Sequence, residues 1–496
     1  MTLKDKAFSA TIWSGAEVFL RQGLQFAFSV ALTRLLSPEE FGTIALLYLF
    51  TGIASAFVDS GFSSALIQRR DVTHTDESTV FWFNLAIGML VALGLCAAAP
   101  AIARFFARPI LVPLTAVMAL NILVSALGSI HGTLLTKRLD FRTQMKVAGI
   151  ASVISGSVAI VMAWRGFGVW ALATQTFAAT SITTLLLWLF NRWRPALVFS
   201  RSSARRLFGF GGYLLASGLL DIVYNRSYAV LIGKLYGVSE LGFYNRADST
   251  KQLPVGEMTG ILGRVAFPIF SEAALDKPQL RRGVQLALRG MMLLNVPMML
   301  GLAAVSQPLV LTLFGHQWLP AVPVLRVLCL GAVFWPLHVI NLNVLLAQGY
   351  SHLFFRLEVV KKLLGITLLL IGASFGVMGI AWSQAIFGTL AFAINAHYTK
   401  RFLNYGTLAQ LRDFLPALTI AVPAAFGVHL LGEQLHLAAP LELTILSALG
   451  ALVFFGLGWT FRLAALHDAI NLFRRPRPLD PSLNSSDEQT NDECPL

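Results

Sequence analysis

Charged residues, cysteines and catalytic motifs are scarce in this sequence. Only 13% of its 496 residues are charged. The three cysteines, Cys96, Cys329 and Cys494, are too few and too widely spaced to predict a disulfide framework or a metal site. No Gly-rich phosphate loop, HExxH zinc motif or nucleophile elbow occurs. We therefore expect neither an enzyme nor an ATP-driven pump, and no cofactor.

Apolar residues take the place of charge. Hydrophobic residues make up 56% of the chain, and the mean hydropathy is +0.69, which excludes a soluble domain and indicates a polytopic membrane protein. The net charge of +13 does not predict nucleic-acid binding, because that requires clustered cations on a soluble fold. Here the cations lie in short connectors, so membrane lipids are the expected partners of that charge.

The apolar runs predict an all-α membrane protein with fourteen transmembrane helices, since about 20 residues are needed to cross a bilayer. The expected spans are 8–35, 41–67, 78–106, 111–136, 143–163, 167–190, 206–236, 241–271, 280–313, 320–347, 353–373, 376–399, 411–431 and 440–463.

Connector charge predicts the orientation. The N-terminus, the even connectors and the tail hold 23 Lys and Arg residues, whereas the odd connectors hold five. Cationic loops stay on the cytoplasmic side, so we expect both termini in the cytoplasm and the chain in the inner membrane of a bacterial cell.

One segment occurs twice. Trp13 to Gly42 is matched by 211–242 at the same spacing, and Phe167-Gly168-Val169 is matched by 375–377. The matched pairs of the first repeat include Arg34 with Lys234, Glu40 with Glu240, and Gly42 with Gly242. Two copies of a six-helix bundle that start on the same side are related by an axis along the membrane normal.

The repeat suggests a division of the chain into lobes. We expect an N-lobe at 1–190, a basic cytoplasmic connector at 191–205 and a C-lobe at 206–400. Two extra helices follow at 401–465, and a polar, Pro-rich cytoplasmic tail at 466–496, whose composition predicts disorder.

Polar residues inside the spans are the candidate site, because charge within a bilayer is costly and lies in a bundle interior or wet cavity. Glu17, Arg21 and Gln25 share one helix face, and Ser217, Asp221 and Asn225 repeat it. The substrate-binding candidates are Arg21, Gln25, Asn225, Arg226, Arg246 and Lys251. The ion-coupling candidates are Glu17, Asp59, Asp221, Asp248 and Glu257.

A structural role for these charges stays open, since Arg21 can neutralise Glu17 or Asp221 and fix helix packing. Other polar residues carry less weight. Glu358, Lys361 and Lys362 are expected to snorkel to the cytoplasmic interface. His338 is expected to be a satisfied structural histidine, and Asn341 and Asn343 to bond across helices.

Several motifs resemble the polysaccharide flippases of the colanic-acid-exporter type, in the multidrug, oligosaccharidyl-lipid and polysaccharide transporter superfamily. The resemblance extends to about residue 400. Its motifs are Lys6 with Trp13-Ser14, Arg34-Leu35-Leu36-Ser37-Pro38 with Phe41-Gly42, Asp59 with Gly61-Phe62, Ala65-Leu66-Ile67-Gln68-Arg69, Phe314-Gly315 with Trp318, and Pro323-Val324-Leu325 with Leu328-Cys329.

This resemblance implies two six-helix lobes that open alternately to either side. It implies an undecaprenyl-pyrophosphate-linked oligosaccharide as cargo, and a cationic cavity that Arg21, Arg226, Arg246 and Lys251 could form. Such cargo needs a wet, positive chamber, because its anionic head cannot cross hydrocarbon unaided. H+ or Na+ could supply the coupling, and a polysaccharide polymerase or export machinery could be a partner.

Three alternatives remain. A multidrug antiporter would share the repeat but favour an acidic, aromatic cavity. A membrane glycosyl polymerase or ligase would need a large outward loop, whereas no expected outward connector exceeds about ten residues. A structural scaffold would not need buried charges.

The charge asymmetry makes a direct prediction about topology. A reporter enzyme fused after Arg477 should be active only when it is a type that functions in the cytoplasm. Paired fusions to a cytoplasmic and a periplasmic reporter test this, and periplasmic activity at this position would overturn the orientation.

Overall fold

The computed structural model describes residues 3–59, 62–69, 71–435 and 437–468. Its helices are α1 (Leu3–Leu35), α2 (Pro38–Asp59), α3 (Phe62–Gln68), α4 (His74–Phe106), α5 (Leu111–Lys137), α6 (Phe141–Trp164), α7 (Val169–Phe190), α8 (Arg201–Leu235), α9 (Val238–Glu272), α10 (Lys277–Ala304), α11 (Ser306–Leu313), the 3-10 helix η1 (His316–Trp318), α12 (Ala321–Ala332), α13 (Trp335–Ala347), α14 (Ser351–Ala373), α15 (Gly376–Leu403), α16 (Thr407–Gln434) and α17 (Ala439–Thr460).

Within this part of the chain ten segments are long and apolar enough to cross a membrane, with α12 and α13 counted together. The protein is therefore a multi-pass helical membrane protein. The long helices α1, α8, α9 and α14 are not among these ten segments of the described residues. These four carry many of the polar residues that the sequence places at membrane depth. A total of fourteen crossings stays a prediction.

Two of the expected spans are divided in the described structure. The span 280–313 becomes α10 and α11, and the span 320–347 becomes α12 and α13. The expected span 41–67 contains parts of α2 and α3, and residues 60 and 61 between them lie outside the described residues. The break between α12 and α13 has a clear cause, because Pro336 lies in the first turn of α13. Proline disfavours the continuation of a helix, because it has no N–H to donate to the preceding turn, whereas it fits the first turn of a new helix.

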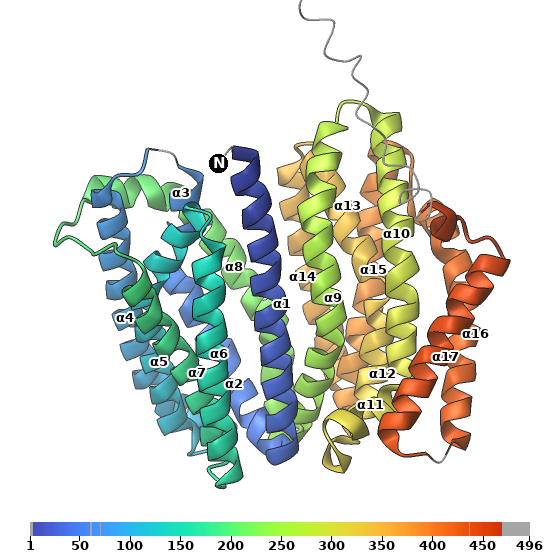
Figure 1. Ribbon diagram of the computed structural model, residues 1–496, viewed down its shortest axis with the longest axis horizontal. Helices are drawn as coiled ribbons and strands as arrows, with labels where there is room; N and C mark the ends of the chain where they lie inside the picture. Colours follow the sequence, from blue (N-terminus) through green and yellow to red (C-terminus); the bar gives the residue numbers. More distant parts are fainter. Residues whose placement is uncertain (1–2, 60–61, 70, 436, 469–496) are drawn as a thin grey trace, which may run out of the picture.

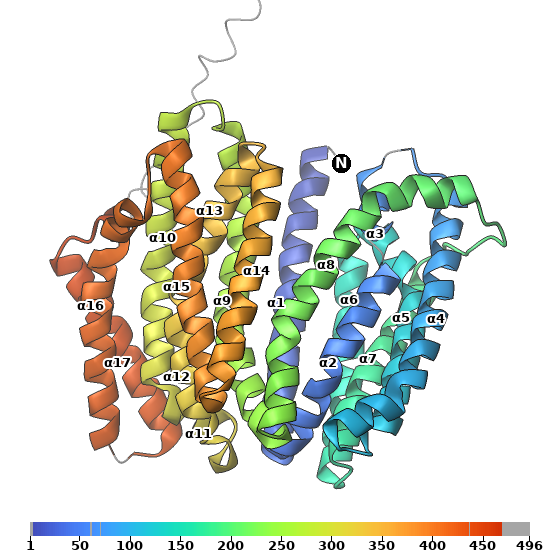
Figure 2. The same cartoon turned by 180° about the vertical axis from the view of Figure 1, so that it is seen from behind.

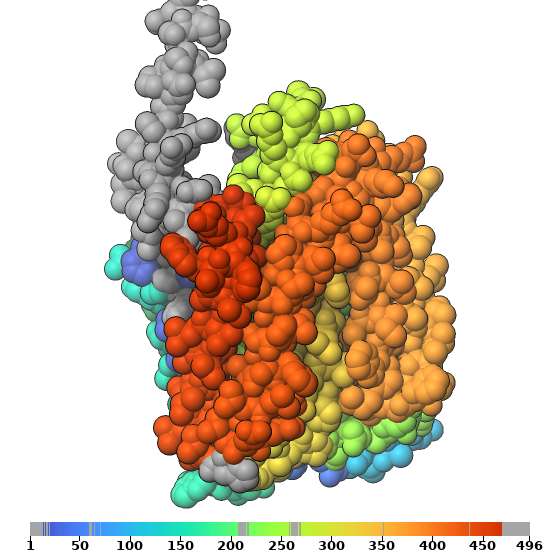
Figure 3. Space-filling view, turned by 90° about the vertical axis from the view of Figure 1, so that its right-hand side faces the viewer, coloured from blue at the N-terminus to red at the C-terminus, as the bar shows by residue number. Residues whose placement is uncertain are grey.

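The helices form two groups with one helix between them. Figures 1 and 2 show α1 to α7 on one side and α9 to α17 on the other. Helix α8 crosses diagonally and packs against α2, α3 and α4 as well as α9 and α14. Helix α8 thus packs against both groups, and the division of the chain at residue 206 stays a prediction. Figure 3 shows α16 and α17 covering one outer side. The expected tail from residue 469 onward lies outside the described residues.

The two groups meet through a reciprocal glycine contact between α2 and α9. A Cβ atom at Gly42 would lie 1.8 Å from the carbonyl oxygen of Val238, and one at Gly242 would lie 1.9 Å from that of Pro38. Both distances are far below any real Cβ contact, so the backbones can approach only because these positions lack a side chain. The glycines occupy matching positions of the sequence repeat, which supports a two-fold relation between the halves.

At the same end of the molecule, one cation from each repeat binds the C-terminal carbonyls of a helix in the other repeat. Arg34, at the end of α1, donates from Nε to the carbonyl oxygen of Leu313 at 2.9 Å and from Nη2 to that of Thr312, at the end of α11. Lys234, at the end of α8, donates to the carbonyl oxygen of Phe105 in the last turn of α4. A cation at a helix C-terminus satisfies orphan carbonyls and the helix dipole. Each repeat therefore caps a helix of the other.

The glycine contact yields a testable prediction about closure. Gly42→Ala should force the two groups apart, since the added methyl overlaps the Val238 carbonyl. In a variant without native cysteines, a cysteine in place of the buried Leu36 reports exposure of this end. We expect its labelling by a membrane-impermeant maleimide to rise roughly tenfold, the effect of an overpacking cost of about 1 to 3 kcal/mol.

The matched control for that experiment is Gly23→Ala. Gly23 lies in α1 with no atom within 4 Å of a Cβ, so labelling should stay at the level of the parent. Equal labelling of the two variants would show that the glycine contact does not hold this end closed.

Candidate functional site

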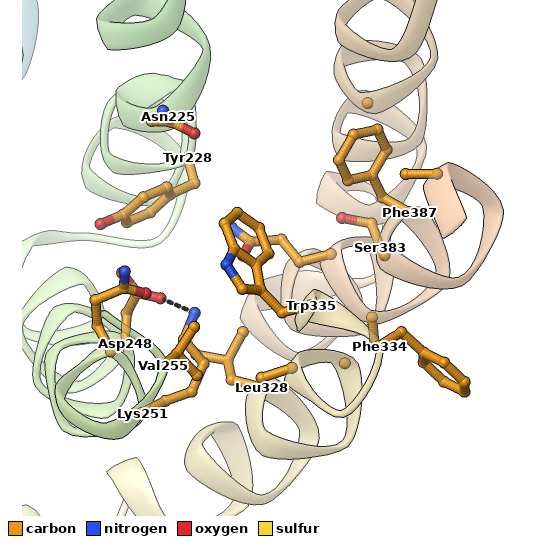
Figure 4. Close-up of a pocket in the computed structure, with 18 of the residues that line it drawn as sticks. Asn225, Tyr228, Asp248, Lys251, Val255, Leu328, Phe334, Trp335, Ser383 and Phe387 are labelled. Carbon is orange, nitrogen blue, oxygen red and sulfur yellow. Dashed lines mark hydrogen bonds and ion pairs between the residues drawn. The ribbon is translucent and has the colours of Figure 1, made fainter. Parts of the chain in front are cut away.

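A cavity of about 430 Å³ lies among α8, α9, α12, α13, α14 and α15. Its volume falls within the range of ligand sites. Figure 4 shows Trp335 at its centre, with Asn225 and Tyr228 on one side and Ser383 and Phe387 on the other. The charged side chains in its wall are Arg226, Asp248 and Lys251, and its aromatic ones are Tyr224, Tyr228, Phe334, Trp335 and Phe387.

Asp248 and Lys251 form an ion pair within the wall. Lys251 Nζ lies 2.6 Å from Asp248 Oδ1 (Figure 4), and the two side chains are 14% and 26% exposed. The residues are three apart on α9, so one helix turn brings them to the same face. Two charges at membrane depth are tolerable here because each neutralises the other.

Arg226 supplies charge that this pair does not cancel. Its guanidinium lies over the ring of Tyr48 in α2, 5.6 Å from the centroid. Among the described ion pairs none involves Arg226. The charged wall is therefore net positive, and Arg226 lies where α8, the cavity and the other group of helices meet.

The break between α12 and α13 brings Trp335 into the cavity. Asn295 of α10 is fully buried and donates from Nδ2 to the carbonyl oxygens of Ala332 at 3.2 Å and Val333 at 2.9 Å. These carbonyls lose their helical partners at the break, and an unsatisfied carbonyl in a membrane is costly. The amide of Asn295 thus stabilises the break between α12 and α13 that Pro336 causes.

The structure brings four of the predicted site residues to this cavity, namely Asn225, Arg226, Asp248 and Lys251. Arg21 and Gln25 lie on α1 with exposed side chains and do not line it. Asp221 pairs with Lys362 of α14 at 2.5 Å, not with Arg21. The side chains of Glu17, Asp59 and Glu257 lie outside the described part of the structure.

Arg246 is also away from the cavity. It is 8% exposed and lies over the rings of Phe41 at 4.5 Å and Trp318 at 5.6 Å, while its Nη1 donates to Ser29 Oγ at 2.8 Å. Trp318 in turn donates from Nε1 to the carbonyl oxygen of Thr33 at 2.8 Å. In this conformation Arg246 therefore belongs to the contact between the two helix groups.

The remaining polar residues differ in outcome. Lys361 does not snorkel: it is 1% exposed and pairs with Glu358, because a carboxylate one turn earlier on α14 lies on the same helix face. His338 accepts a hydrogen bond from Asn395 at 2.8 Å, which confirms a satisfied histidine, although it also lines the cavity. Asn341 bonds to Gln410 and Thr399 across helices, as predicted.

The aromatic residues of the cavity were not predicted from the sequence. Phe334-Trp335-Pro336 interrupts an apolar span, and interrupted spans mark binding sites in transporters of this general kind. That signal was present in the sequence. Tyr224 and Tyr228 flank Asn225 and Arg226 and carried no such signal, since tyrosines in a membrane helix are more often packing residues.

Comparison with known proteins gives a consistent result. Residues 31–323 match the family described as polysaccharide biosynthesis protein. The teichuronic acid biosynthesis protein TuaB of Bacillus subtilis (strain 168) is 29% identical, over 91% of this chain and 95% of its own. The succinoglycan biosynthesis transport protein ExoT of Rhizobium meliloti (strain 1021) is 31% identical, over 62% of this chain and 63% of its own.

Two solved structures share the fold. The lipid II flippase MurJ, in an inward closed conformation, has a TM-score of 0.75 and 16% identity, over 91% of this chain and 98% of that one. An inward-facing multidrug resistance MATE family transporter has a TM-score of 0.60 and 16% identity, over 80% of this chain and 98% of that one. At this identity the likeness concerns the fold alone.

The ion pair in the cavity wall can be tested by its effect on stability. Asp248→Asn should lower the free energy of unfolding by about 1 to 2 kcal/mol, less than the cost of breaking a fully buried pair, because the side chains are partly exposed. Adding Lys251→Met to this variant should restore most of the lost stability. The free energy of unfolding is compared by thermal unfolding of the purified proteins.

Glu39→Gln is the matched control, since Glu39 pairs with Arg108 at an exposed position, where the effect should stay within about 1 kcal/mol. No recovery in the double variant would mean that the two charges are not coupled.

Proposed function

This chain belongs to the polysaccharide biosynthesis protein family, and we propose that it moves a lipid-linked oligosaccharide across the membrane. The cargo is an undecaprenyl-pyrophosphate-linked repeat unit, carried from the cytoplasmic to the periplasmic leaflet for polysaccharide assembly. The single observation that carries this proposal is the family match, which runs from residue 31 near the end of α1 to residue 323 in the first turn of α12. ExoT, a relative over 62% of this chain, is named a transport protein.

The cavity supports the same function. A pyrophosphate head needs cationic, hydrogen-bonding surroundings, and the wall offers Arg226, Lys251 and the amide of Asn225. Arginine suits this head because its planar fork makes bidentate bonds to phosphate oxygens. Trp335 and Phe387 offer flat apolar surfaces beside these groups, suited to the apolar faces of sugar rings.

Movement would follow alternating access. With both termini in the cytoplasm of a bacterial cell, the end held by Gly42, Gly242, Arg34 and Lys234 faces the periplasm. This conformation is then closed toward the outside. Export requires the reciprocal contacts to separate while the cytoplasmic end closes, with the lobes 1–190 and 206–400 moving about α8 and fourteen helices crossing the inner membrane.

An ion gradient is the proposed source of energy, with H+ or Na+ as coupling ion. Asp248 is the best placed carboxylate, because it lies in the cavity wall beside Lys251. Asp221 is a second candidate, paired with Lys362. Arg21 and Gln25 would enter the path from α1. The polysaccharide polymerase or export machinery would receive the product.

A multidrug antiporter of the same superfamily is the second candidate. The MATE transporter shares the fold over 80% of this chain, and the cavity is rich in aromatic residues beside an aspartate, as expected for cationic drugs. The net positive wall and the family match favour the anionic cargo.

A reconstitution experiment tests the proposal. Purified protein in vesicles should move a fluorescent undecaprenyl-pyrophosphate oligosaccharide between leaflets, measured by its protection from a membrane-impermeant sugar oxidant. Transport should persist without ATP and collapse with an ionophore. Movement of a cationic dye, with none of the lipid-linked sugar, would favour the antiporter.

In the same assay Arg226→Ala should lower transport at least about tenfold, which is the effect expected from the loss of one charge-assisted hydrogen bond. Arg226→Lys should retain part of the transport activity, since lysine keeps the charge but lacks the planar guanidinium fork. Arg201→Ala, an exposed arginine at the start of α8, is the control. Thermal unfolding of each variant separates a loss of binding from a loss of folding. Full activity of Arg226→Ala would remove this residue from the site.

A further inference from the structure

A second pocket, of about 590 Å³, lies far from the cavity, where α10 begins and α15 ends. Figure 3 shows these two helix ends next to each other at one end of the molecule, and Figure 1 shows the N-terminus at the same end. Its walls hold five cations and two amide side chains, and no carboxylate. They are Lys277, Arg281, Arg282, Gln285, Lys400, Arg401 and Asn404.

The carboxylates near this pocket are engaged elsewhere. Asp276 caps α10 and accepts from the backbone nitrogen of Gln279 at 3.0 Å. Asp413 binds Arg289 and the hydroxyl of Tyr405, and Asp468 lies 3.6 Å from Arg289. Among the described ion pairs none includes any of the five cations in the pocket. Within the described part of the chain, no ion pair therefore balances their mutual repulsion.

Two of the cations are held in place by packing. The guanidinium of Arg281 lies over the ring of Tyr405, 5.9 Å from its centroid. Tyr405 is fully buried and donates to Asp413 at 2.6 Å. The stem of Lys400 packs on Gly406, where a Cβ would lie 2.9 Å from its Cβ and Cδ. A pocket whose cations are ordered in advance loses less entropy when it binds an anion.

From this arrangement we propose that the pocket binds the phosphate headgroup of an anionic phospholipid in the cytoplasmic leaflet. Basic pockets between membrane helices on the cytoplasmic side suit such headgroups. A lipid fits better than a soluble phosphate because apolar surface continues from the pocket: Leu286, one turn beyond Arg282 on α10, is 40% exposed. An acyl chain would lie there, while Gln285 and Asn404 donate to phosphate oxygens.

The consequence is an anchor for one helix group. Binding would tie the start of α10 and the end of α15 to the membrane surface, away from the end that carries the reciprocal glycine contact. This role is separate from transport of the oligosaccharide, so its test does not depend on the proposed function.

The test uses the purified full-length protein in an uncharged detergent at fixed ionic strength. Short-chain phosphatidylglycerol, short-chain phosphatidylcholine and inorganic phosphate are titrated separately, and binding is measured by native mass spectrometry and by thermal stabilisation. We expect phosphatidylglycerol alone to bind. Changing both Arg281 and Arg282 to Gln should weaken that binding about thirtyfold, the effect of two cations near an anionic lipid.

The matched control changes Arg201 and Arg205 to Gln, which removes the same charge from exposed positions at the start of α8 and should alter binding less than twofold. Because Arg281 also packs on Tyr405, a second variant with Lys400 and Arg401 changed to Gln must show the same loss. Equal losses in pocket and control variants would reduce the site to general surface charge. Equal binding of inorganic phosphate would overturn the lipid assignment.

Discussion

The contact that organises this molecule is the approach of two helix starts without side chains between them. At Gly42 and Gly242 the backbone of each half lies against a carbonyl of the other. Such an approach is available only to glycine, and it sets the distance at which every other group at this end must meet. The caps made by Arg34 and Lys234, and the position of Arg246 over Phe41 and Trp318, all depend on it.

The charged residues of the membrane helices named here follow a simple rule. Asp221 is paired with Lys362, Asp248 with Lys251, and Lys361 with Glu358. Each pair removes most of the cost of placing an ion at this depth. Arg226 stands apart, because its guanidinium lies over a ring of the other helix group and the cavity lies beside it. A cation kept at this depth without a carboxylate partner among the described ion pairs is explained by an anionic ligand more readily than by packing.

The sequence predicted the features that repeat and missed those that do not. Gly42 with Gly242 and Arg34 with Lys234 were visible as matched positions, and the structure places each pair in equivalent contacts. The partner of Asp221 was not predictable. Several cations lie within reach of a helix face, and only the crossing of α8 against α14 selects Lys362 over Arg21. Helical spacing fixes which residues share a face, but not which neighbouring helix that face meets.

One departure from the repeat explains where the cavity lies. The fourth expected span forms the continuous helix α5, whereas its counterpart, the tenth, is divided into α12 and α13 at Pro336. Irregular backbone at membrane depth is tolerated only where protein or a cavity satisfies it, and Asn295 provides that partner in the second half. The break turns Trp335 into the cavity. The two halves therefore share the contact that closes one end, while the cavity around Trp335 belongs to the half whose helix is interrupted.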